Sequence, residues 1–156
     1  MLSGGSMQQT KKNQGFTLIE LMVTVAVMAI IAMMAAPSFG NILEKRRYEQ
    51  NARELLLILS QAKSQAILSR GNVSANLVSN SANTPTMLNW AVRNSGTTLS
   101  ISPSVTASTF TFDRNGLVSN ISGDTTITLC NSKVKIKKLI VVTRLGAFII
   151  KSEETC

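Results

Sequence analysis

The sequence predicts an α+β protein in which one long N-terminal helix packs on a mostly antiparallel β domain. Three observations support this fold class. Residues 21–43 carry no charge, residues 44–70 place apolar side chains three and four positions apart, and the residues after Gly71 alternate apolar and polar side chains in short runs. These are the patterns of a membrane-length helix, an amphipathic helix and half-buried strands, respectively.

The first part of the predicted helix is apolar on all sides. At 1.5 Å per residue, residues 21–43 extend for about 34 Å, which exceeds a hydrocarbon core of ~30 Å. Glu20 stands at the start of this run, where an ionisable group costs at least ~2.5 kcal/mol in a bilayer core. A plain membrane anchor has no use for this carboxylate, so we expect it to have a partner. Pro37 is expected to kink the helix, because it removes one backbone hydrogen bond.

The second part of the helix, residues 44–70, carries a single apolar stripe that we interpret as a core contact. Its members are Tyr48, Ala52, Leu55, Leu56, Leu59, Ala62 and Ala66. Gly71 follows Arg70 and is typical of a helix end. One helix is therefore predicted from about Thr17 to Arg70.

Seven strands are predicted in the remaining chain, at residues 73–78, 87–93, 97–101, 109–113, 125–130, 133–142 and 147–151. Clusters of Asn, Ser, Gly and Pro separate them, as in Asn94-Ser95-Gly96 and Asn115-Gly116. Short strands joined by short turns indicate a mostly antiparallel sheet or two packed sheets.

Composition limits the chemistry of the chain. There is no histidine, which excludes histidine-based metal sites and Ser-His or Cys-His catalysis. No phosphate-binding loop or metal cluster is visible, so we predict a protein that is not an enzyme and has no metal and no cofactor. A net charge of +8 favours phosphate, anionic lipid or acidic protein surfaces as partners.

The residues Gly15-Phe16-Thr17-Leu18-Ile19-Glu20 follow Lys11 and Lys12 and open the apolar run. This segment resembles the N-terminus of type IV pilins and type II secretion pseudopilins, and within them the FimT/FimU/GspH-like minor subunits. The resemblance implies that residues 1–15 are a leader, with Met1 or Met7 as its start. Prepilin peptidase would remove the leader between Gly15 and Phe16, and Phe16 would then be N-methylated.

The same resemblance assigns roles to the other segments. Residues 16–43 would form a transmembrane helix that later enters the filament core, where Glu20 would set register by pairing with the N-terminal amine of a neighbouring subunit. Residues 44–156 would form an extracytoplasmic domain of the GspH type, with the helix at 44–70 and a β-rich part at 72–156. Residues 110–116, Phe-Thr-Phe-Asp-Arg-Asn-Gly, resemble a strand and turn of that domain.

Two cysteines, Cys130 and Cys156, are present. They would stay reduced in the cytosol and would pair in an exported domain. Since the resemblance places this domain outside the cytoplasm, we expect a disulfide.

A basic segment admits two interpretations. Lys133, Lys135 and Lys137 alternate with apolar residues, which predicts that they share one strand face, and Lys138 breaks the alternation. The first interpretation is a solvated, lysine-protected sheet face. The second is contact with DNA phosphates through Lys133, Lys135, Lys137, Lys138 and Arg144. Some FimT-type proteins carry a G-R-x-R motif, but the matching residues 146–149 are Gly-Ala-Phe-Ile, without either arginine.

Three functional hypotheses follow. The first is a FimT/FimU-like minor pilin that contributes to type IV pilus assembly or priming, and to DNA uptake. The second is a DNA-binding minor pilin whose main role is capturing DNA in natural transformation. The third is a minor pseudopilin of the H type in type II secretion. The resemblance implies a single-pass protein of the bacterial inner membrane with a periplasmic C-terminal domain, which later joins a filament at the cell surface. Its implied partners are prepilin peptidase, the inner membrane, other minor pilins, the major pilin and, for DNA uptake, double-stranded DNA.

Overall fold

The structure is a computed structural model that describes residues 16–156, without the side chains of residues 35–38 and 107. Its helix α1 spans Leu18–Ser69 and contains 52 residues. The chain divides into two compact units, one ending at Phe39 and the other spanning Gly40–Cys156. The proline at position 37 was predicted to kink the helix, but its side chain lies outside the described residues.

The second unit contains the amphipathic part of α1 and all the strands. The predicted stripe is confirmed: Tyr48, Leu55 and Leu59 are fully buried, as are the alanines at 62 and 66. The helix ends as predicted, although the left-handed residue is Arg70, with φ of 52°, rather than glycine. The N–H of Gly71 donates to the carbonyl of Ala66 over 3.2 Å, which is the pattern of a Schellman motif.

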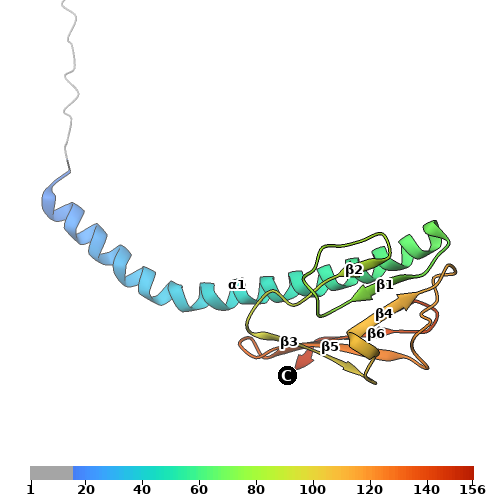
Figure 1. The fold of residues 1–156 in the computed structure, drawn as a ribbon. Coiled ribbons are helices and arrows are strands. Elements are labelled where there is room, and N and C mark those ends of the chain that lie inside the picture. Colours follow the sequence, from blue (N-terminus) through green and yellow to red (C-terminus); the bar gives the residue numbers. More distant parts are fainter. Residues whose placement is uncertain (1–15) are drawn as a thin grey trace, which may run out of the picture. The chain divides into compact units, whose positions relative to one another are not determined.

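Eight strands and one 3₁₀ helix follow α1 within the described residues, and Figure 1 labels six of the strands. They are β1 (Val73–Asn76), β2 (Met87–Asn89), β3 (Thr97–Ser102), η1 (Thr106–Ser108), β4 (Thr109–Phe112), β5 (Thr125–Asn131), β6 (Ile136–Val142), β7 (Phe148–Ile150) and β8 (Glu154–Thr155). Each of the seven predicted strands is found at its place in the sequence, with different ends. The short strand β8 was not predicted.

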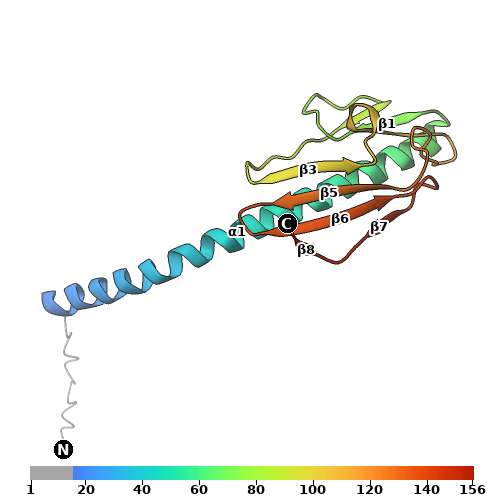
Figure 2. The same cartoon turned by 90° about the horizontal axis from the view of Figure 1, so that it is seen from below.

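The strands form two sheets. The smaller has the order β2-β1-β4, in which β1 and β2 run parallel. The larger has the order β3-β5-β6-β7, and β8 also pairs with β6, all antiparallel. Figure 2 shows α1 crossing one face of this larger sheet. The prediction of a mostly antiparallel α+β domain is therefore confirmed.

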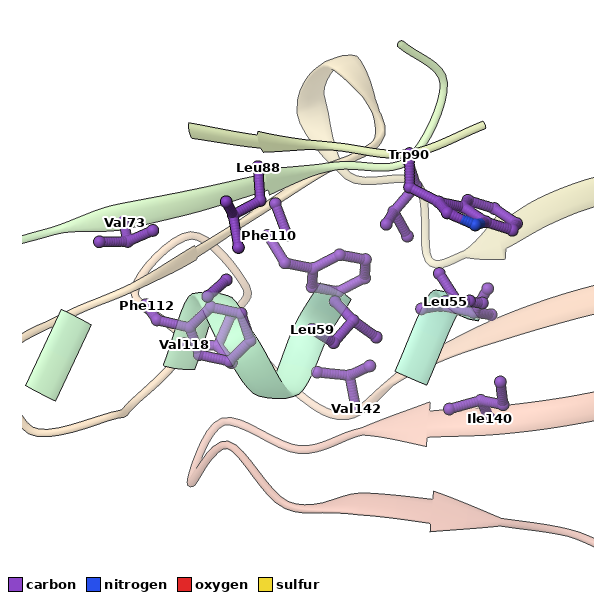
Figure 3. Packing of buried hydrophobic residues seen from close by; sticks show 14 of the residues in the cluster. Leu55, Leu59, Val73, Leu88, Trp90, Phe110, Phe112, Val118, Ile140 and Val142 are labelled. Atoms are coloured by element: carbon purple, nitrogen blue, oxygen red, sulfur yellow. The ribbon is translucent and has the colours of Figure 1, made fainter. Parts of the chain in front are cut away.

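The core lies where α1 meets both sheets. In Figure 3, Leu55 and Leu59 of α1 lie between Phe110 on β4 and the pair Ile140 and Val142 on β6. All of these side chains are fully buried. Burying a side chain of this size contributes about 1.5–3 kcal/mol, so the helix stripe stabilises the packing of both sheets.

Candidate functional site: the processing motif and the basic surfaces

The processing motif begins a helix with its own hydrogen bonds. Thr17 precedes α1, and its hydroxyl oxygen accepts a 3.3 Å hydrogen bond from the N–H of Glu20. In return, the N–H and hydroxyl of Thr17 donate to the Glu20 carboxylate over 3.4 and 3.3 Å. This reciprocal arrangement is a capping box, which satisfies N–H groups that a helix start leaves free. The predicted cleavage residue Gly15 lies outside the described residues.

In the first unit, the apolar side chains between residues 16 and 34 are exposed. Phe16 is 85% exposed, and every large apolar side chain from Leu18 to Met34 is at least half exposed. Glu20 is the one charged residue between Phe16 and Met34. Among the residues that the structure describes, no single helix is both long enough and apolar enough to cross a membrane. The segments Leu18–Met34 and Phe39–Ser69 reach the required length and hydropathy only when they are taken together.

The predicted disulfide is confirmed. Cys130 on β5 is bonded to Cys156, with 5.7 Å between their Cα atoms. The segment before Cys156 is also held by charge, because Glu154 pairs with Lys137 over 2.9 Å and Glu153 pairs with Lys138 over 3.1 Å. The C-terminal segment is therefore fixed to β6 by strand pairing and two ion pairs, and to β5 by one covalent bond.

The prediction that Lys133, Lys135 and Lys137 share one strand face is wrong. Residues 132–135 form a turn, and β6 begins only at Ile136. The cause is the side chain of Asn131, whose Oδ1 accepts hydrogen bonds from the N–H groups of Lys133 and Val134 over 3.0 and 3.2 Å. An asparagine side chain that bonds the backbone ahead of it favours a turn over a strand.

The five lysines and arginines proposed for DNA contact consequently fall into three groups. Lys133 and Lys135 lie in the turn before β6, while Lys137 and Lys138 lie on β6 in the ion pairs with Glu154 and Glu153. Arg144 lies just beyond the opposite end of β6, and the two ends of this strand are about 20 Å apart at 3.3 Å per residue. These residues do not form one surface.

The structure brings the turn of Arg144 next to a second, similar turn that carries Arg114. We term these turns, residues 143–146 and 113–116, the arginine turns. In each turn, the N–H of the glycine donates a hydrogen bond of 2.9 Å to the carbonyl oxygen of the first residue. Both glycines have a positive φ, which is 77° at Gly116 and 71° at Gly146. Each turn carries an exposed arginine at its second position, Arg114 or Arg144. Figures 1 and 2 both place the loops after β4 and β6 at the end of the domain where α1 ends.

The arginine turns are packed directly on each other. The N–H of Val118 donates a 2.9 Å hydrogen bond to the carbonyl of Arg144. A Cβ atom at Gly146 would meet the carbonyl oxygen of Gly116, and Lys63 of α1 donates 2.8 Å to the carbonyl of Gly146. The backbone segments that carry Arg114 and Arg144 are thus in contact, and the side chain of Lys63 is bonded to one of them. Within the described residues, no carboxylate forms an ion pair with Arg114 or Arg144.

A buried polar network lies at the opposite end of the domain. The Oε1 atom of Glu44 accepts hydrogen bonds of 2.9 Å from both Asn131 and Asn94. Asn94 in turn accepts 2.6 Å from Asn51, and Asn131 also donates 2.9 Å to Thr97. The amide of Asn131 and then that of Asn94 lower the pKa of Glu44 below its usual 4.5, against the opposing effect of burial.

Sequence patterns predicted the turn at Asn115-Gly116, but they revealed neither its contact with residues 143–146 nor the buried network. The network joins residues that lie far apart in the sequence, so it leaves no local pattern. The capping box has a signal, the spacing of Thr17 and Glu20 ahead of an apolar run. The two turns also share a signal, an arginine two positions before a glycine. In the part of the chain that the structure describes, no three His, Cys, Asp or Glu residues are placed to hold a metal ion.

Comparisons with known proteins identify the family. Residues 10–36 match the model of the prokaryotic N-terminal methylation motif. Residues 51–146, more than half of the chain, match that of the type II transport protein GspH. No curated protein and no solved structure matches the chain. The methylation motif implies processing by prepilin peptidase and assembly with other pilins. The chain therefore belongs to the family of the type II transport protein GspH, and it is a pilin-like minor pilin or pseudopilin.

Proposed function

We propose that the chain is a FimT/FimU-like minor pilin of a type IV pilus. Residues 16–43 hold it in the bacterial inner membrane, with residues 44–156 in the periplasm, until it joins the filament or a priming complex. The observation that supports this role is the exposure of every large apolar side chain from Leu18 to Met34, a stretch in which Glu20 is the one charge. A surface of this kind needs either lipid or other apolar helices around it.

Glu20 has a specific task in this proposal. Removal of residues 1–15 leaves a free amine on Phe16, which is then methylated but keeps its positive charge. The capping box with Thr17 holds the Glu20 carboxylate one turn from the start of its own helix. In a water-poor filament core, this carboxylate pairs with the amine of a neighbouring subunit, since a buried charge without a partner is strongly unfavourable.

The test compares Glu20→Ala with Glu20→Gln and with Glu49→Ala, a change at an acid of the second unit. Leader removal, membrane insertion and presence in sheared filaments are measured for each. We expect all variants to insert, and both Glu20 variants to be depleted from filaments at least tenfold, which corresponds to about 1.4 kcal/mol. Incorporation of Glu20→Ala at the level of the unchanged protein would contradict the proposed role of Glu20.

A second candidate function, DNA capture for natural transformation, is supported by the arginine turns. Arg114 and Arg144 are exposed and unpaired within the described residues, and Lys63 lies beside them. A cluster of this kind suits phosphate contacts without base recognition. It replaces the set first proposed, because Lys137 and Lys138 are already neutralised by acids.

DNA capture is tested by titrating labelled duplex DNA with the full chain in detergent, across a salt series. We expect binding that weakens with salt, and a loss on changing Arg114 and Arg144 to Gln. The double change of Lys137 and Lys138 to Gln is the matched control, expected to bind as the unchanged protein does. Equal binding by both double variants would exclude the arginine turns as the DNA site.

The phenotype of a deletion strain distinguishes a minor pilin from the alternative, an H-type pseudopilin of type II secretion. Deletion of the gene abolishes or reduces surface pili if the chain is a minor pilin. Normal piliation together with a loss of protein secretion would instead assign the chain to type II secretion.

A further inference from the structure

Five cations surround the point where the second unit begins. Lys45, Arg46 and Arg47 are consecutive exposed residues of α1, and successive residues point about 100° apart around a helix. The exposed Lys133 and Lys135 reach the same place from the turn between β5 and β6. Together with Asn41, Ile42 and Lys45, they line one shallow groove of about 380 Å³. We call the five cations Lys45, Arg46, Arg47, Lys133 and Lys135 the basic collar.

No residue of the basic collar forms an ion pair within the part of the chain that the structure describes. Among the residues that the structure describes, the three ion pairs involve Arg93, Lys137 and Lys138, and none involves a collar residue. Glu44 lies nearby and attracts Lys133 and Arg47, but it is only 8% exposed and its Oε1 already accepts two amide hydrogen bonds. The collar therefore presents an excess of positive charge to its surroundings.

Apolar side chains lie among these cations. Ile42 and Leu43 are each about half exposed, at 52% and 51%, and Val134 and Ile136 are half-buried in the same groove as Lys133 and Lys135. Lysine and arginine stems that cover apolar surface while their charged ends extend outward are typical of a membrane interface. A purely solvated basic face would not need exposed isoleucine and leucine.

We propose that the basic collar binds the anionic phospholipid headgroups of the membrane in which the apolar segment is anchored. The collar and this segment are close in the chain, since only Glu44 separates Lys45 from the uncharged residues 21–43. Basic residues immediately beside a membrane helix attract anionic lipids and lose this attraction beyond a Debye length. This proximity favours lipid over an acidic protein partner. The proposal rests on the membrane anchoring in the proposed function.

Lipid contact has a structural consequence for the domain. Lys133 and Lys135 belong to the turn that Asn131 fixes, and Asn131 also holds Glu44 at the start of the amphipathic helix. Headgroups bound at the collar therefore contact two segments of the second unit that the buried network joins. We infer that lipid holds this end of the domain against the membrane surface before assembly, and that entry into a filament requires its release.

The experiment uses the full chain in nanodiscs of phosphatidylcholine, with or without phosphatidylglycerol. The rate of amine labelling is measured by mass spectrometry at Lys45, Lys133 and Lys135. Lys63 is the internal reference, about 30 Å along the helix from residue 43. We expect phosphatidylglycerol to slow labelling of the three collar lysines about fivefold, to leave Lys63 unchanged, and to lose its effect at high salt.

The variant is the double change Lys133→Gln and Lys135→Asn. Glutamine keeps most of the side-chain stem that packs on Gly96, and asparagine tolerates the φ of 53° at position 135. We expect this variant to lose most of the lipid-dependent protection at Lys45. The matched control, Arg114→Gln with Arg144→Gln, keeps it.

Equal labelling with and without phosphatidylglycerol would overturn the proposal. Protection that appears only when another minor pilin is added would also overturn it, and would assign the collar to a protein partner. The nanodiscs contain no pilus machinery, whereas the proposed function is scored by filament incorporation in cells. The two experiments can therefore fail independently, and a failure of the lipid contact can be distinguished from a failure of the pilus role.

Discussion

The hydroxyl group of Tyr48 donates a 2.9 Å hydrogen bond to the carbonyl oxygen of Leu129, 81 residues further along the chain. The bond joins α1 to β5 at a point where both residues are fully buried. Burial, followed by the negative charge of Glu153, raises the pKa of Tyr48 to about 12, although the backbone N–H of Lys138 acts in the opposite direction. The neutral phenol is therefore the form that the folded domain requires.

Tyr48 makes the domain sensitive to alkali. Its folded pKa of about 12 exceeds the unfolded value of 10. The stability that it contributes is therefore complete below pH 10 and is lost as the pH rises from 10 towards 12. Tyr48→Phe should lose about 1 kcal/mol at neutral pH and show less decline above pH 10. Tyr48 is the one tyrosine in the chain, so tyrosinate absorbance reports it directly. A titration midpoint near 10 in the folded protein would contradict this prediction.

The buried network predicts the response to acid. Because the pKa of Glu44 is lowered, its carboxylate stabilises the folded state above pH 4.5, and this contribution is lost as the pH falls through the folded pKa. Glu44→Gln should be less stable than the unchanged protein at pH 7, and the difference should narrow below pH 4.5. Thermal unfolding of the full chain in detergent across this pH range measures it. Glu49→Gln, outside the network, is the matched control, and an equal pH profile for both variants would refute the assignment.

The contact between the arginine turns predicts an unequal pair of glycine substitutions. Gly146→Ala places a Cβ against the carbonyl oxygen of Gly116 at a positive φ of 71°. We expect a loss of about 2–4 kcal/mol, which combines the left-handed conformation with overpacking. At Gly123, nothing lies within 4 Å of an added Cβ, so Gly123→Ala should change stability by less than ~0.5 kcal/mol. Denaturant unfolding compares the two, and equal effects would show that the turns separate readily.

The disulfide is expected to be a large share of the stability of the second unit. Its two cysteines are separated by 26 positions, for which loop closure in the unfolded chain contributes ~3.5 kcal/mol. The double change of Cys130 and Cys156 to Ser should lose about this amount in denaturant unfolding. Because Lys137–Glu154 and Lys138–Glu153 remain, the C-terminal segment should keep part of its pairing with β6. A variant as stable as the unchanged protein would indicate that these ion pairs and β8 suffice.

Much of the fold could be predicted because the spacing of apolar residues along the sequence matches the helix or strand period. The stripe from Tyr48 to Ala66 follows the helix period, and the buried positions of β5 follow the two-residue period. The strand β8 was missed since Glu154-Thr155 has no apolar residue. It pairs with β6 next to two ion pairs and a disulfide, all of which depend on residues distant in sequence.

The basic segment shows how a local pattern can mislead. Alternation from Lys133 to Lys137 has the period of a strand, yet the hydrogen bonds that Asn131 Oδ1 accepts from the backbone stabilise a turn instead. The same asparagine also binds Glu44, 87 positions earlier. The position of Lys133 and Lys135 beside Lys45 is therefore a consequence of tertiary contacts. The cleavage motif, by contrast, is contiguous and could be recognised without any knowledge of the fold.

Because Gly146 contacts Gly116, neither arginine turn can change in length without displacing the other. An epitope tag or a single inserted residue in either arginine turn would displace both, so these turns are poor places to label the protein. Gly123 has open space where its Cβ would be and lies between Ile121 and Thr125, which are both buried. A fluorophore or affinity tag introduced at residue 123 should leave both arginine turns intact, and would allow the subunit to be followed into a filament.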